Sequence, residues 1–239
     1  MRHPGFVRWA GVVLAVLALP AWPALGAKDK TKKVDLIWSH PQFDSLGIKS
    51  VALLPASSFD HNRQNERLVE TLFAQSLRPS GYRWVTPLIG REMIKSALGE
   101  STLAAIDRDV LKQGRVDSLR AGALCRALRT DAVLTTRVDL FEQVQVEWNQ
   151  AGKPTTTVRL RAAVVDSAGR LLWTASGGET GEGTYHDPSS ATMGVKSDGL
   201  GSTPITAQGG APSFEEVTTR LFTRWMAFFP HKAATPAQP

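Results

Sequence analysis

The sequence predicts an α/β fold, a mixed sheet of about five strands flanked by helices. Up to about residue 131, short apolar runs alternate with segments whose apolar side chains recur every three or four positions. Three further runs then follow one another with alternating side chains and short turns, as antiparallel strands do. Together these patterns predict the order β-α-β-α-α-β-β-β-α. A length of 239 residues fits one such domain or two small ones.

The first half of the predicted domain contains two short strands, each followed by an amphipathic helix. In order, these are a strand over residues 50–55, a helix over about 62–77, a strand over 82–86 and a helix over 87–99. Asp60 or Asn62 is placed to cap the first helix. Pro87 suits the first turn of the second helix.

The second half adds a helical or loop segment to about residue 114, a further helix, the three antiparallel strands and a closing helix. The predicted ranges are a helix over 119–128, strands over 131–141, 155–165 and 170–175, and a helix over 214–229. The alternation of the first of these strands continues through Trp148. Asp117 or Ser118 caps the helix that carries Cys125, and Ser213 caps the last helix. The apolar neighbours of Cys125 predict a buried thiol that packs as a small hydrophobe.

Residues 176–212 differ from the rest of the chain in composition. They include nine Gly, five Ser, five Thr and three Pro. So long a connection inside a compact domain predicts a mobile or functional loop.

The first 27 residues have the layout of a secretory signal peptide. Arg2 and Arg8 precede an apolar run over residues 9–19, which is too short to span a bilayer, and small residues follow. The cysteine that a lipoprotein signal needs is absent, because the only cysteine is Cys125. We therefore expect a periplasmic protein with a flexible leader and lead-in over 28–47, a single domain over 48–230 and a disordered tail over 231–239.

The formal charge of +6 comes mostly from outside the predicted domain. Arg2 and Arg8 leave with the signal peptide, and residues 28–33 carry four lysines against Asp29. The remainder of the chain is close to neutral, with 22 basic and 21 acidic residues. The charge therefore does not indicate a nucleic-acid partner, although Lys28–Lys33 predicts a weak contact with anionic lipid.

No residue pattern identifies a catalytic, cofactor or metal site, so we expect none. The candidate partner-binding residues are Arg137, Arg159, Arg161, Tyr185 and His186. The three arginines alternate on predicted strands and point to one face of the sheet. The alternative interpretation of this stripe is a solvated surface with Asp139 as the cross-strand partner.

Four segments follow one another in an order that resembles a known group of bacterial envelope proteins. They lie at residues 48–55 (IKSVALLP), 81–87 (GYRWVTP), 128–134 (LRTDAVL) and 164–173 (VVDSAGRLLW). The pattern is similar to proteins related to the curli-secretion lipoprotein CsgG, the penicillin-binding-protein activator LpoB and the N-terminal domain of TolB, nearest to uncharacterised lipoproteins of that group. It spans about residues 46 to 230.

This resemblance implies an anticodon-binding or TolB-N-like sheet and non-catalytic work in assembling or activating an envelope machine. The expected partner is an envelope protein or a second copy of the chain. Two alternatives stay open. One is a small periplasmic hydrolase that uses Ser57, Ser58 and His61, and the other is a homo-oligomeric scaffold whose strand edges pair.

Overall fold

The computed structural model describes residues 35–147, 150–185 and 210–232. The predicted signal peptide, the lysine-rich segment, His186 and most of the predicted tail lie outside these ranges. No helix within them is both long and apolar enough to cross a membrane.

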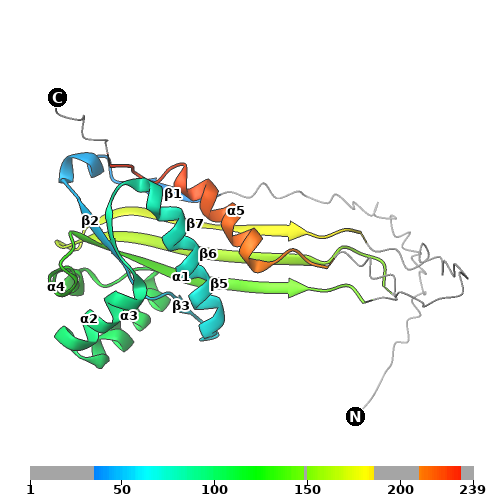
Figure 1. Cartoon of the computed structure of the whole chain (residues 1–239), viewed down its shortest axis with the longest axis horizontal. Coiled ribbons are helices and arrows are strands. Elements are labelled where there is room, and N and C mark those ends of the chain that lie inside the picture. The colour runs from blue at the N-terminus through cyan, green and yellow to red at the C-terminus, as the bar shows by residue number, and fades with distance from the viewer. Residues whose placement is uncertain (1–34, 148–149, 186–209, 233–239) are drawn as a thin grey trace, which may run out of the picture. The chain divides into compact units, whose positions relative to one another are not determined.

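A seven-stranded mixed sheet organises the described residues, with strand order β1-β7-β6-β5-β2-β4 and β3 paired with β5 (Figure 1). The strands are β1 (Leu36–Ser39), β2 (Ser50–Leu53), β3 (Ser57–Ser58), β4 (Arg83–Val85), β5 (Ala132–Val144), β6 (Thr155–Asp166) and β7 (Leu171–Glu182). β2 runs parallel to β4 and β5, whereas β5, β6 and β7 form an antiparallel meander. The predicted fold class is confirmed. After residue 50 the predicted order recurs with two additions, the short strand β3 and a third helix between β4 and β5.

Five helices connect or cover the strands, and three of their predicted caps are present. The helices are α1 (Arg63–Leu77), α2 (Pro87–Leu98), α3 (Glu100–Gln113), α4 (Ser118–Leu128) and α5 (Phe214–Met226). The Asn62 side chain accepts hydrogen bonds from the first turn of α1, Asp117 from α4 and Ser213 from α5. Each cap satisfies amide groups that have no partner within the helix.

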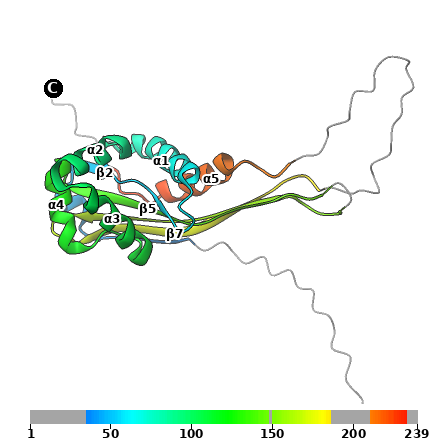
Figure 2. The ribbon, with the colours of Figure 1, turned by 90° about the horizontal axis from the view of Figure 1, so that it is seen from below.

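The helices lie on both faces of the sheet (Figure 2). α1 and α5 pack on the first face, where Phe73 stacks on Phe222 at 4.4 Å between ring centroids. α2, α3 and α4 pack on the second face, against residues such as Leu54, Val133 and Val165. Segments buried on both faces read as continuous apolar runs, as residues 51–54 and 162–165 do.

Beyond this two-faced region, β5, β6 and β7 run on past α2, α3 and α4 (Figure 1). In this part of β6, Val158 and Leu160 are buried on the first face, while Arg159 and Arg161 are exposed on the second. α5 covers the first face through Val217, and Phe214 stacks on Phe141 at 4.8 Å. In this region, we call the second face of β5, β6, β7 and β1 the open face.

β7 is longer than predicted. The strand continues through residues 176–182, which the composition had placed at the start of a mobile loop, so that expectation is wrong for these residues. The glycines of residues 176–182 let other side chains approach the backbone of β7 closely. A Cβ on Gly177 would collide with the Asp35 carboxylate, and one on Gly181 would lie 2.8 Å from Val217 Cγ2.

Two further strands add to the five predicted strand ranges. The lead-in supplies β1, which pairs with β7 as an edge strand, from Leu36 beside Ser176 to Ser39 beside Trp173. Ser57 and Ser58 form the short β3, which continues the parallel pairing on β5. The sheet therefore has seven strands instead of about five.

Arg224 on α5 joins three parts of the fold by charge. Its guanidinium donates two hydrogen bonds to Asp35, at 2.7 and 3.1 Å, and also pairs with Glu179. A further hydrogen bond reaches the Gly178 carbonyl at 3.2 Å. Asp35 and Glu179 are largely buried, so Arg224 holds α5 and the start of β1 against the outer edge of β7.

Removing this guanidinium is expected to destabilise the fold. Arg224→Ala leaves two largely buried carboxylates without their shared cation and should lower the free energy of unfolding by about 2 to 4 kcal/mol. Denaturant unfolding measures the change. Arg220→Ala is the matched control, because its pair with Glu216 is exposed and should contribute less than about 1 kcal/mol. Equal effects of the two variants would contradict this role of Arg224.

Candidate functional site

The open face is built from rows of side chains that cross four strands. The registers place Leu36 beside Ser176, Ser176 beside Arg161, and Arg161 beside Arg137. Cross-strand neighbours on one face lie close enough for their side chains to interact. The structure thus brings together the three arginines that the alternation assigned to one face.

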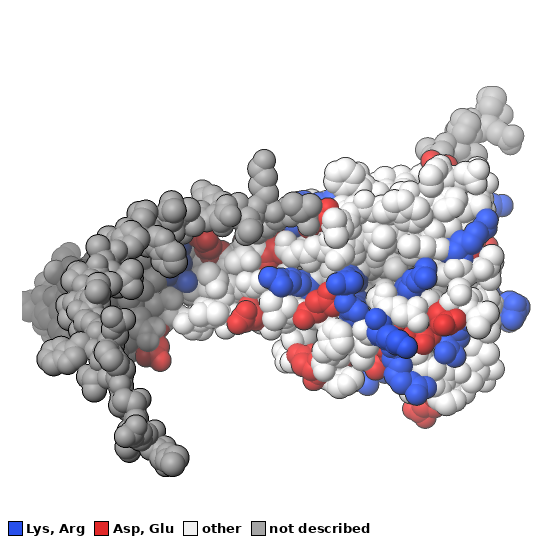
Figure 3. Space-filling model, turned by 180° about the vertical axis from the view of Figure 1, so that it is seen from behind, with Lys and Arg blue, Asp and Glu red and all other residues white. Residues whose placement is uncertain are grey.

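Arg159 and Arg161 are exposed on this face. Arg161 Nε donates to Asp139 Oδ2 at 3.0 Å, so the predicted pairing with Asp139 is confirmed. The stem of Arg159 lies over Gly178, where a Cβ would come within 2.9 Å of Arg159 Cγ. Figure 3 shows lysines and arginines in a band across the domain, with acidic residues between them. These two arginines are held in place but remain open to a partner.

Arg137 is different, because its side chain is only 7% exposed. Nε donates to Asp139 Oδ1 at 2.6 Å and Nη1 to the Leu111 carbonyl at 2.9 Å. The Phe59 ring lies over the guanidinium, 5.2 Å from its carbon. Arg137 therefore joins β5, α3 and the turn after β3, and we correct its role from partner contact to internal support.

The two remaining candidates lie beyond the end of β7. Tyr185 is 56% exposed, as a contact residue would be. His186 falls outside the described residues.

Sequence reasoning missed the apolar part of the open face. Trp38 on β1 is 44% exposed and packs edge-on against His40 at 6.0 Å. Leu36 on the same strand is 68% exposed, and its register places it on the face of Arg161. The alternation of Leu36, Ile37 and Trp38 was the available signal, since Ile37 packs on the core.

The alternative hydrolase residues lie around the start of α1. Ser57 and His61 line one hollow of about 280 Å³, together with Arg91 and Asp107. Within the described part of the chain, the Ser57 hydroxyl has no hydrogen-bonded base, which a serine nucleophile needs.

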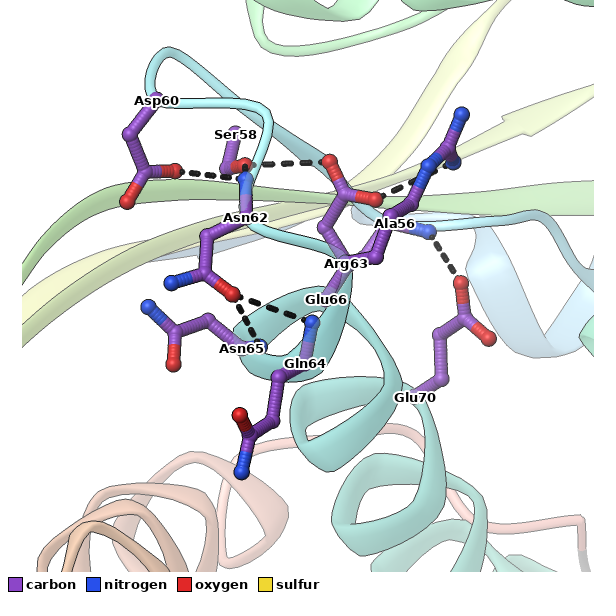
Figure 4. Close-up of polar contacts among 9 residues, drawn as sticks. All are labelled: Ala56, Ser58, Asp60, Asn62, Arg63, Gln64, Asn65, Glu66 and Glu70. Carbon is purple, nitrogen blue, oxygen red and sulfur yellow. Dashed lines mark hydrogen bonds and ion pairs between the residues drawn. The ribbon is translucent and has the colours of Figure 1, made fainter.

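Ser58 serves the fold instead. Its hydroxyl donates to Glu66 Oε1 at 3.0 Å, and the other Glu66 oxygen pairs with Arg63 at 3.1 Å (Figure 4). The Asn62 amide donates to the Ser58 hydroxyl at 3.1 Å. These contacts fix the first turn of α1 on β3.

Cys125 is buried on α4, as predicted. Burial among apolar side chains raises the pKa of its thiol to about 12. At neutral pH this thiol is protonated and packs as a hydrophobe. The described residues contain no group of three or more His, Cys, Asp or Glu side chains placed to hold a metal ion.

The different roles of Arg137 and Arg159 predict different costs of truncation. Arg137→Ala removes a buried charge with three contacts and should lower the free energy of unfolding by about 2 kcal/mol. Arg159→Ala changes an exposed side chain and should cost about 0.5 kcal/mol or less. Thermal or denaturant unfolding of both variants checks this; a larger loss from Arg159→Ala would contradict it.

Comparison with known proteins gives neither a matching family model nor a matching curated protein. Solved structures with a similar course of the chain include lipoprotein GNA1162 from Neisseria meningitidis, 22% identical over 56% of this chain and 83% of that one, with a TM-score of 0.42.

Two others are the PelC dodecamer from Paraburkholderia phytofirmans and the hypothetical protein CT253 from Chlamydia trachomatis. PelC is 15% identical over 81% of this chain and 96% of its own, with a TM-score of 0.42. CT253 is 14% identical over 75% and 94%, with a TM-score of 0.39. None of these three is a CsgG, LpoB or TolB chain, so that resemblance stays a prediction.

Proposed function

We propose that this chain is an exported, non-catalytic accessory protein of the bacterial cell envelope that binds another protein chain through its open face. β5, β6 and β7 have 13, 12 and 12 residues. They extend beyond the helices of the second face (Figure 1), and this extension is the observation that carries the proposal. Sheets in stable domains bury their apolar faces, and a face left open at such length is available for contact.

The side chains of the open face suit a protein interface. Trp38 and Leu36 on β1 offer apolar area that is separated by β7 from Arg159 and Arg161 on β6. Trp and Arg are among the residues most enriched at binding hot spots. Because Arg161 is already paired with Asp139, its guanidinium is oriented before any partner arrives. The partner that fits is a chain presenting acidic groups next to an aromatic or aliphatic patch.

The edge of the sheet adds a second mode of contact. Among the described residues, β1 pairs with β7 along one side only, so its other side presents backbone N–H and C=O groups. Such an edge accepts an added strand from another chain. Its short length of four residues limits that contribution and leaves the open face as the main surface.

The envelope location in this proposal rests on the predicted signal peptide and on the resemblance of the four sequence segments. A second copy of this chain and a different envelope protein both satisfy the chemistry of the surface. The mass of the captured complex distinguishes them.

Site-specific crosslinking tests the proposal. One variant carries the photo-crosslinking residue p-benzoylphenylalanine in place of Arg159, and a control carries it in place of Leu88, which is exposed on α2. Irradiation of intact envelopes should give one discrete product from the Arg159 position and none from Leu88. That product should be lost when Trp38→Asp is added, because the apolar anchor is removed.

Absence of a product at Arg159, or the same products from both positions, would overturn the proposal. A product of twice the chain mass assigns the face to self-assembly. Any other single mass assigns it to a different protein, which mass spectrometry identifies.

A further inference from the structure

A second surface lies where the parallel strands begin, and five cations line it. Lys49, Arg83, Arg126, Arg129 and Lys232 border an open groove of about 530 Å³. All five are exposed. Since the chain without its leader is close to neutral, this concentration of positive charge is local to the groove.

A neighbouring acid offsets only part of the positive charge of the groove. Asp131 is the one carboxylate among the lining residues, and it accepts hydrogen bonds from the Lys49 amide, the Ser50 amide and the Ser50 hydroxyl, each at 2.9 Å. Burial opposes its ionisation, but these hydrogen bonds and the charge of Arg83 outweigh burial and lower the pKa of Asp131. Within the described ranges none of the five cations has an ion-pair partner.

Arg129 stands in a backbone conformation that arginine seldom adopts. It ends α4 with φ 54° and ψ 46°, the left-handed region where Gly or Asn is usual. A non-glycine residue there costs about 1 kcal/mol. Arg83 Nη2 donates to the Arg129 backbone carbonyl at 3.0 Å, which ties the Arg83 guanidinium to the end of α4. Strain of this kind clusters at binding sites, where the side chain is needed for function.

An apolar hollow of about 350 Å³ adjoins the groove, and Lys49 and Lys232 line both. Phe43, Ile48 and Tyr82 form the apolar part of its lining, and Asp44 and His231 line it as well. Tyr82 is only 8% exposed, and its hydroxyl has no hydrogen-bond partner among the described residues. A cationic groove beside an apolar hollow matches a molecule with a negatively charged head and a nonpolar tail.

We propose that the groove binds a phosphate-bearing amphiphile, with the phosphate on Arg83, Arg126 and Arg129 and the nonpolar part against Phe43 and Tyr82. Guanidinium groups bind phosphate oxygens through paired hydrogen bonds. The apolar hollow favours an amphiphile over free phosphate. This surface is separate from the open face and does not depend on the function proposed above.

Isothermal titration of the purified protein with soluble short-chain lipids tests the site. The probes are dihexanoyl phosphatidylglycerol, dihexanoyl phosphatidylcholine and inorganic phosphate, all below the micelle concentration. Phosphatidylglycerol should bind at least about tenfold more tightly than either of the others, since only it combines a net negative headgroup with a nonpolar tail.

Arg129→Gly separates binding from folding. Glycine relieves the left-handed strain, so the variant should be as stable as the parent or more stable, yet its affinity for phosphatidylglycerol should fall about tenfold. Arg108→Gln, at an exposed position on α3 outside the groove, is the matched control and should leave affinity unchanged.

Three results would overturn the proposal. They are unchanged affinity in Arg129→Gly, equal binding of inorganic phosphate and phosphatidylglycerol, and tighter binding of a single-stranded oligonucleotide with the same dependence on Arg129. The second would leave a simple anion site and the third a nucleic-acid site. Each can occur whatever the crosslinking result at Arg159.

Discussion

Whether a strand segment is apolar on one face or on both faces determines where helices pack in this structure. Residues 132–134 on β5 and 162–165 on β6 are buried on both faces, so they require helices above and below. Farther along, only the first face of β6 is apolar, through Val158 and Leu160. α5 covers that face, whereas the second face of β6 carries the exposed Arg159 and Arg161 there. The open face is the direct result.

Ion pairs then hold α5 and β1 in place and orient the arginines of β5 and β6. Arg224 ties α5 to Asp35 and Glu179, which holds the edge strand β1 on β7. Asp139 stands at a bulge of β5 and pairs with both Arg137 and Arg161. The first arginine is thereby committed to the interior and the second is presented to solvent. Asp139 thus holds Arg137 inside the fold and orients Arg161 at the surface.

Most of the fold could be predicted from local patterns, because helix caps and apolar periodicity act over a few residues. Asn62, Asp117 and Ser213 were recognisable as caps for that reason. The end of β7 could not be predicted, since Gly177 and Gly181 report close approaches to Asp35 and Val217 that only the folded chain reveals. The burial of Arg137 depends on Phe59 and the Leu111 carbonyl, both distant in sequence. The groove around Arg129 was missed because its cations come from four separate segments of the chain.

The central claim is that another protein covers the open face in the envelope. Hydroxyl-radical footprinting measures this on the unmodified chain, because Trp38 is oxidised only where water reaches it. We predict that Trp38 is protected in intact envelopes relative to the purified, dilute protein. Phe228, exposed after the end of α5, should be oxidised equally in both. Equal oxidation of Trp38 in the two samples would contradict the account.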